Sequence, residues 1–242
     1  MHLKLTIEYD GTPYRGWAAQ PGHATVEDVL RAALGETFHE FGNLAVAGRT
    51  DTGVHALANV VSVDVGGGPP AERAVDALNS RLPEEVSVTS AAEAPADFHA
   101  RFSARSRTYR YRIFNRCVAS PFEHRRALWI RRPLHVEELN ASAHLLLGEH
   151  DFRAFTPAVT RHRVFTRTVE RAEWIRRDDH LDFEITADSY LRHMVRTLVG
   201  TMLELSPSDL GQLLDSRTRS EAGTTAPPWG LYLVSVAYDG SL

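Results

Sequence analysis

The order of periodic segments in the first hundred residues constrains the fold more than any other feature of the sequence. Leu3–Tyr9 alternates apolar and polar residues, which is typical of a half-buried strand. A turn follows at Asp10–Pro13, and Thr25 then stands at the N-cap of a helix that extends to about Phe38. The next segments predict a strand, a strand, a helix and a strand at residues 44–46, 57–65, 71–81 and 86–91.

The rest of the chain repeats this order loosely. It predicts strands at 108–115, 164–175, 181–186 and 231–238, helices at 136–147 and 190–205, and insertions at 116–132 and 206–229. The order β-α-β-β-α-β is that of the ferredoxin-like split unit. The sequence therefore predicts an α+β protein of two ferredoxin-like domains with mainly antiparallel sheets. We expect the domains at residues 1–104 and 105–242.

Composition and motifs exclude several classes of protein. The 242 residues are 43% hydrophobic and 24% charged, close to the averages of soluble globular proteins. No apolar run reaches the ~18 residues that a membrane span needs. Cys117 is the only cysteine, which excludes an intramolecular disulfide and a Cys-x-x-Cys zinc site. No His-Glu-x-x-His motif is present and only scattered histidine pairs occur, so the sequence indicates a metal site only weakly. No signal peptide is present, so we expect a soluble cytoplasmic protein.

Arginine is concentrated in two segments, although the net charge of the whole chain is −4. Residues 101–132 contain ten arginines and a single acid, Glu123, and residues 161–177 contain six arginines and two acids. Lys4 is the only lysine, and arginine differs from lysine in offering a planar fork that fits phosphate and stacks on bases. Two interpretations are open. The arginines could bind a polyanion at one face, or they could form a solvated strand face balanced by carboxylates elsewhere.

The sharpest chemical motif is Ala-Gly-Arg-Thr-Asp-Thr-Gly-Val-His-Ala at residues 47–56, between two predicted strands. Gly48 and Gly53 allow the backbone to turn tightly and to approach a ligand. Asp51 and Arg49 lie between them, and loops held on rigid strands are where catalytic groups concentrate. Local chemistry alone fits a surface Arg–Asp pair in an Asx-turn equally well. The motif lacks the Lys-Ser/Thr of a loop that binds nucleotide triphosphates.

Two further segments carry polar groups that suit RNA. Tyr109 and Tyr111 share one face of a predicted strand, and the arginines beside them share the other. Such tyrosines are either a platform for an unstacked base or half-buried sheet residues. Arg196 lies at the margin of the apolar stripe of the 190–205 helix. It either pairs with an acid or a phosphate there or extends its charged end into solvent.

Taken together, these segments resemble the tRNA pseudouridine synthase A (TruA) family over nearly the whole chain. The resemblance rests on Tyr9-Asp10-Gly11, Gly16-Trp17, Gln20, Thr25-Val26-Glu27, the 48–55 motif, Phe98–Ala104, Tyr109-Arg110-Tyr111, Asp151-Phe152, Phe155, Met194-Val195-Arg196 and Gly230–Leu233. The motif Gly-Arg-Thr-Asp-x-Gly-Val-His is the most specific of these. Thr52 stands where the family often has Ala, which leaves every chemical group of the reaction in place.

The resemblance implies an isomerase that converts uridine to pseudouridine at positions 38, 39 and 40 of the tRNA anticodon stem-loop, without cofactor or metal. By the same resemblance Asp51 is the catalytic acid, Tyr109 contacts the target base, Arg196 is the basic partner of Asp51, and Arg49 lies beside it. We expect Arg196 to pair with Asp51 across the domain interface, with the active site in the cleft between the domains. We also expect a homodimer that holds one tRNA across both subunits.

The residues suit this chemistry, and two rival classes remain as alternatives. Breaking the bond between the base and C1′ develops positive charge on the sugar, which one carboxylate can stabilise or trap. The target base must also leave its helix, and stacking on Tyr109 would offset part of that cost. A non-catalytic RNA-binding protein is the first alternative, but it would not need an Asp between two glycines. A nucleoside or glycoside hydrolase is the second, but it usually needs a second acid or a metal.

Overall fold

The computed structural model describes residues 1–160, 162–216 and 218–239, which divide into two compact units. The first unit contains Met1–Arg107 and the segment that begins at Tyr232, and the second contains Thr108–Leu231. Within the described residues, no helix is both long enough and apolar enough to cross a membrane.

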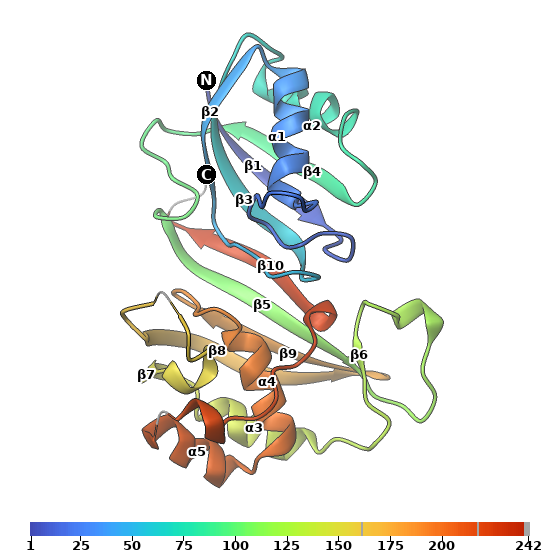
Figure 1. Ribbon diagram of the computed structural model, residues 1–242, viewed down its shortest axis with the longest axis vertical. Helices are drawn as coiled ribbons and strands as arrows, with labels where there is room; N and C mark the ends of the chain where they lie inside the picture. Colours follow the sequence, from blue (N-terminus) through green and yellow to red (C-terminus); the bar gives the residue numbers. More distant parts are fainter. Residues whose placement is uncertain (161, 217, 240–242) are drawn as a thin grey trace. The chain divides into compact units, whose positions relative to one another are not determined.

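The first unit is a mainly antiparallel sheet with two helices on one face (Figure 1). In chain order it contains β1 (His2–Tyr9), α1 (Val26–Thr37), β2 (Glu40–Val46), β3 (His55–Gly66), α2 (Ala71–Asn79) and β4 (Val86–Glu93), and most of β10 (Leu231–Tyr238) joins it. Strand β1 pairs antiparallel with both β3 and β4, and β2 pairs antiparallel with β3. This confirms the predicted order of strands and helices in the first hundred residues.

Local signals place these elements. The Thr25 hydroxyl caps α1 by accepting from the Asp28 amide at 3.3 Å, and it donates to the Asp28 carboxylate at 2.6 Å. The alternation in β1 buries Leu3, Leu5 and Ile7 completely. The apolar stripe of α1 packs on the same core.

Strand β10 belongs mainly to the first unit, whereas the sequence pattern assigned residues 231–238 to the second domain. Strand β10 runs parallel to β3, with Tyr232 beside His55 and Leu233 beside Ala56. On that edge of β3, β2 pairs only with residues 61–66, so the backbone groups at the start of β3 need another partner. Tyr232 and Leu233 supply it and are themselves buried.

The second unit has the strand order β5-β9-β8-β7, with three helices gathered on one face (Figure 1). Its elements are β5 (Ala104–Phe114), which starts in the first unit, β6 (Leu128–Trp129), α3 (Val136–His144), β7 (Gly148–Asp151), β8 (Thr166–Arg177), β9 (His180–Ala187), α4 (Met194–Glu204) and α5 (Pro207–Ser216). Short 3₁₀ turns lie at Pro121–Glu123, Arg153–Phe155, Arg219–Glu221 and Pro228–Gly230. The β7–β8 and β8–β9 pairs are antiparallel, which confirms the α+β class.

Two features of this unit differ from the sequence-based expectation. The helix expected from residue 190 begins at Met194, because His193 has φ 62° and this left-handed conformation cannot continue a helix. Helix α5 lies in what was expected to be an insertion. Its start is capped by Ser206, whose hydroxyl accepts from the Asp209 amide at 3.2 Å.

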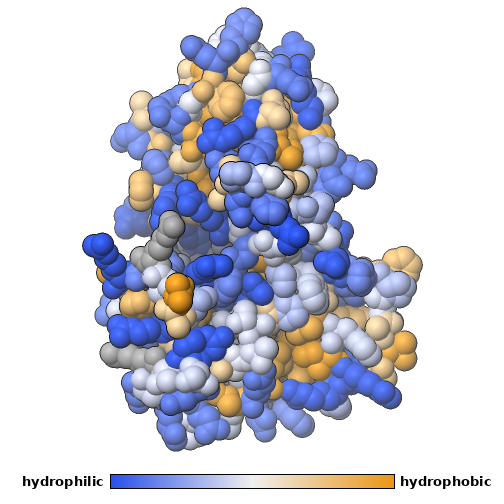
Figure 2. All heavy atoms as spheres, in the orientation of Figure 1, coloured by the Kyte–Doolittle hydropathy of each residue, from blue (hydrophilic) through white to orange (hydrophobic). Residues whose placement is uncertain are grey.

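The 116–132 insertion exposes apolar side chains. Phe122 is 90% exposed and Val118 is 69% exposed. Figure 2 shows hydrophobic atoms on the segment that projects at the right of the view. The insertion is tied to the β8–β9 turn by Glu123, whose carboxylate lies 3.1 Å from the His180 ring.

Candidate active site

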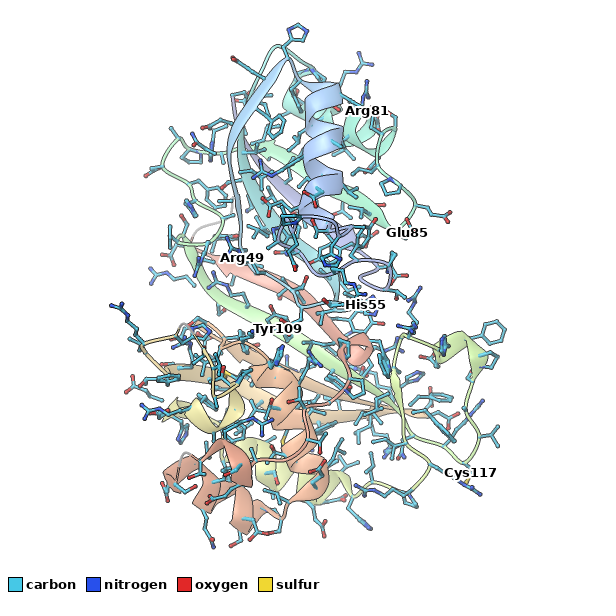
Figure 3. The ribbon with its side chains drawn as sticks, viewed as in Figure 1. Arg49, His55, Arg81, Glu85, Tyr109 and Cys117 are labelled. Atoms are coloured by element: carbon cyan, nitrogen blue, oxygen red, sulfur yellow. The ribbon has the colours of Figure 1, made fainter. Side chains whose placement is uncertain are left out.

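Residues 47–54 of the motif form the loop between β2 and β3, the Asp51 loop, with Arg49 near its start and His55 just after its end (Figure 3). Arg49 is exposed and Asp51 is partly buried. The Val54 amide donates to the Asp51 carbonyl at 3.1 Å, and Gly53 has φ 75°, so the loop ends in a tight turn. Asp51 is therefore fixed at a turn on the rigid start of β3.

The segment after β1 supports this loop through two close backbone approaches. A side chain at Gly11 would place its Cβ 2.0 Å from the Val54 carbonyl oxygen, and one at Gly16, which has φ 92°, would place it 2.7 Å from the Thr50 carbonyl oxygen. The Trp17 amide donates to the same Thr50 oxygen at 3.0 Å. Both glycines are thus required by the packing of residues 11–17 against the Asp51 loop.

A buried polar network fixes the start of the loop. Asn59, which is fully buried on β3, donates to the Gly48 carbonyl at 2.8 Å and accepts from the Gly48 amide at 3.3 Å. Its amide also donates to the Tyr9 hydroxyl at 3.2 Å, and that hydroxyl bonds the Thr50 hydroxyl at 2.8 Å. Sequence reasoning missed Asn59, although an Asn within the apolar 57–65 strand was a signal that a buried polar group needs partners.

Tyr9 gives this network a measurable pH signature. Burial raises the pKa of Tyr9 to about 12, while its hydrogen bonds with Thr50 and Asn59 oppose the rise. The unfolded chain loses the Tyr9 proton near the ordinary pKa of about 10, so stability from this group is complete below pH 10 and falls as pH rises toward 12. We expect the free energy of unfolding, measured in urea, to fall with pH in this window by ~1.4 kcal/mol per pH unit less in the Tyr9→Phe variant than in the wild type. Equal pH slopes would contradict this assignment.

His55 is buried at the end of the Asp51 loop and joins that loop to Gly11 and Tyr232. Its Nδ1 accepts from the Gly11 amide at 3.1 Å, since a backbone N–H can only donate. The ring stacks on Tyr232 at a centroid distance of 4.6 Å and an angle of 19°. The neighbouring Asp10 carboxylate lies 3.1 Å from Nδ1 and accepts from the Thr12 amide at 3.0 Å. The histidine of the motif therefore packs as part of the loop's support.

The other two predicted site residues lie in the second unit. Tyr109 lies on β5 (Figure 3) and is only 8% exposed. Its ring meets the Tyr190 ring edge-on at a centroid distance of 4.8 Å. Arg196, in the first turn of α4, donates from Nε to the Ala226 carbonyl at 2.8 Å. Burial raises the pKa of Tyr111, and the Arg196 charge opposes that rise. Asp51 and Arg49 are in the first unit, so the pairing of Asp51 with Arg196 stays a prediction.

Part of the arginine concentration balances buried acids. Asp182 and Glu184 on β9 are nearly buried, and four arginines of β5 and β8 pair with them: Arg110, Arg112, Arg171 and Arg177. The shortest of these contacts join Arg177 to Asp182 at 2.8 Å and Arg110 to Glu184 at 2.9 Å. The strand-face interpretation is therefore correct for these four. Arg125 and Arg131 are exposed, and Arg161 lies outside the described residues.

The described residues contain no group of three or more His, Cys, Asp or Glu side chains arranged to hold a metal ion.

Comparisons with known proteins agree on one family. The tRNA pseudouridine synthase family model matches residues 5–103 and 142–239. A relative named tRNA pseudouridine synthase A from Brucella anthropi is 38% identical over 97% of both chains. Another of that name from Hydrogenovibrio crunogenus is 40% identical over 99% of this chain and 93% of its own. A chain from the crystal structure of a Cbf5-Nop10-Gar1 complex matches 96% of this chain and 48% of its own, with 12% identity and a TM-score of 0.37.

Proposed function

The chain belongs to the tRNA pseudouridine synthase family, and we propose that it converts uridine to pseudouridine at positions 38, 39 and 40 of the tRNA anticodon stem-loop. It is an isomerase that acts on tRNA uridine. The observation that carries the proposal is the Asp51 loop, a single carboxylate fixed at a turn by the glycine contacts and by the Asn59 network. Relatives of nearly equal length support the assignment of the whole chain.

The reaction rearranges one nucleoside without changing its composition. The N1–C1′ bond breaks, the uracil turns, and C5 bonds to C1′. N1 gains a proton and C5 loses one, so atoms and electrons balance. Asp51 is proposed to stabilise or trap the positive charge that develops on the sugar. A site that excludes water would retain the free uracil until C5 is in place.

The remaining residues are assigned around Asp51. Arg196 is proposed to keep the Asp51 carboxylate ionised and oriented. Arg49, exposed two residues before Asp51, suits an RNA phosphate beside the target nucleotide. Tyr109 is proposed to contact the target base, and its ring is already fixed by the edge-on contact with Tyr190.

The decisive experiment uses tRNA labelled with tritium at uracil C5. Release of tritium supports the isomerase, because only bond formation at C5 displaces that hydrogen. Release of free uracil instead would indicate a hydrolase. Binding with neither product would indicate a non-catalytic RNA-binding protein.

Substitution of Tyr109 separates stacking from proton transfer. Tyr109→Phe keeps the ring and should retain most of the activity, whereas Tyr109→Leu should lose about tenfold or more, the value of one base–aromatic stack. The single-turnover rate of tritium release measures both variants. If the Phe variant is as inactive as the Leu variant, the hydroxyl has the essential role.

We also propose that the enzyme acts in the cytoplasm as a homodimer that holds one tRNA across both subunits. A chain of 27.0 kDa has little area to contact the body of a tRNA as well as its anticodon stem. A second copy would double the arginines that are not engaged with Asp182 and Glu184. Light scattering that shows a monomer at micromolar concentration would contradict the dimer.

Arg125 and Arg126, in the 116–132 insertion, are expected to bind tRNA phosphates. Arg125 is exposed and has φ 54°, so the chain turns sharply at this pair. Changing both to Ala should weaken tRNA binding and reduce the slope of log affinity against log salt by about 1–2 units, because each neutralised phosphate releases counterion. The rate at saturating enzyme should stay unchanged. A salt slope equal to that of the wild type would contradict the role.

A further inference from the structure

An exposed aromatic ring stands on the loop between β4 and β5, in the first unit. Phe102 is 77% exposed, although Phe98 of the same loop is buried. The His99 ring lies 4.3 Å from the Phe102 ring between centroids, and the Arg101 guanidinium lies 5.6 Å from the Phe102 centroid. A flat apolar ring is thus displayed to solvent beside a cation.

The loop holds this ring in place through its own hydrogen bonds. The His99 Nδ1 accepts from the amides of Arg101 at 3.1 Å and Phe102 at 3.3 Å. The Ser103 hydroxyl accepts from the His99 amide at 3.0 Å, and the Ser103 amide donates to the His99 carbonyl at 2.9 Å. The backbone on both sides of Phe102 is therefore fixed, which pre-organises its exposed ring for contact with a partner.

The same loop is joined to the Asp51 loop by one buried side chain. Arg107, only 9% exposed, donates to the Arg101 carbonyl at 2.7 Å and to the Ala47 carbonyl at 3.3 Å. Ala47 is the residue from which the Gly48–Asp51 stretch begins. Ala47 and Ala100 also share a buried cluster with Val60 and Phe98. Phe102 and Asp51 are thus carried by two loops that are fixed to each other within the first unit.

The chemistry of this surface matches an unstacked nucleobase. Turning a uridine out of a stem removes a stacking partner from the bases next to it, at a cost of a few kcal/mol. An exposed aromatic ring offers a replacement face to any base, and a neighbouring arginine binds the phosphate that follows. The exposed cations Arg49 and Arg101 favour this polyanion over an apolar protein partner.

We propose that Phe102 is a stacking platform for a nucleobase adjacent to the target uridine, with Arg101 on the neighbouring phosphate. This inference rests on the proposed function, since it places the RNA on the Asp51 loop. The role of Phe102 differs from the one proposed for Tyr109, which is contact with the target base, because Phe102 replaces the stacking that a neighbouring base loses.

The test compares Phe102→Leu, Phe102→Trp and the wild type in tRNA affinity and in single-turnover tritium release. We expect Phe102→Leu to weaken tRNA binding about tenfold. Phe102→Trp, which keeps an aromatic face, should restore binding to within twofold of the wild type. Because the Phe102 side chain is mostly exposed, thermal unfolding of both variants should match the wild type. Leu147→Ala is the control, because Leu147 is an exposed apolar side chain of the second unit outside the 116–132 insertion, and it should leave affinity unchanged.

The outcomes separate this inference from the function on which it rests. Tritium release by the wild type, with unchanged affinity in Phe102→Leu, would overturn only the platform. An equal loss in Leu147→Ala would also overturn it, because the loss of any exposed apolar side chain would then have the effect. Failure of Phe102→Trp to restore binding would exclude stacking. The absence of tritium release by the wild type would overturn the proposed function together with this inference.

Discussion

Replacing Asp51 by Asn is expected to abolish pseudouridine formation while leaving the fold and tRNA binding intact. Asp51 is the only acid in the 47–54 loop, and Asn preserves the size of the side chain and much of its hydrogen bonding. The change removes the negative charge that would stabilise or trap the sugar cation. We expect the single-turnover rate of tritium release to fall on the order of 10⁴-fold, which corresponds to about 5–6 kcal/mol of barrier.

The neighbouring residue provides the control for this prediction. Thr52 is exposed and carries no group that the reaction needs, so Thr52→Ala should retain the wild-type rate. A rate for Asp51→Asn within tenfold of the wild type would remove Asp51 from the mechanism. A parallel loss of tRNA affinity would instead point to a binding role for the carboxylate.

Local sequence signals predicted most of the elements. The alternation of β1 and the Thr25 cap of α1 depend on residues close in the chain, and both are confirmed. The predicted start of α4 at residue 190 was wrong, because the left-handed backbone at His193 has no signature in residue type. The place of β10 depends on which part of β3 is left unpaired by β2, a fact about residues that are far apart in sequence.

In the candidate site, too, the features set by nearby residues could be predicted, and those set by residues far apart in sequence could not. The glycine spacing around Asp51 indicated a loop, and the loop is there. What supports it could not be predicted, because Tyr9 and Asn59 are fifty residues apart and meet only when β1 pairs with β3. The arginine segments were ambiguous from composition, which fitted either a polyanion surface or a strand face balanced by carboxylates. Asp182 and Glu184 on the adjacent strand pair with part of these arginines, and such pairing depends on which strands become neighbours.

Replacing Asn59 by Leu is expected to cost both stability and catalysis. The Leu side chain has a similar size but leaves the partly buried Gly48 amide and carbonyl without their partner and removes a donor to Tyr9. An unsatisfied buried polar group costs about 1–3 kcal/mol, and less where water reaches it, so we expect a loss of ~2–3 kcal/mol in the free energy of unfolding. Because Gly48 begins the stretch that carries Asp51, the catalytic rate should fall by about 100-fold, with a smaller change in tRNA affinity.

Asn79, a second asparagine of the first unit, provides the control for this prediction. Asn79 forms the same reciprocal pair of bonds, donating to the Val88 carbonyl at 2.9 Å and accepting from its amide at 2.8 Å, but it joins α2 to β4. It is exposed, so Asn79→Leu should cost less stability and should leave the rate per folded molecule unchanged. Asn59→Leu must be assayed at a temperature where urea titration shows it to be folded. If its rate then equals that of Asn79→Leu, the network supports the fold alone, and the position of Asp51 depends on the Gly11 and Gly16 contacts instead.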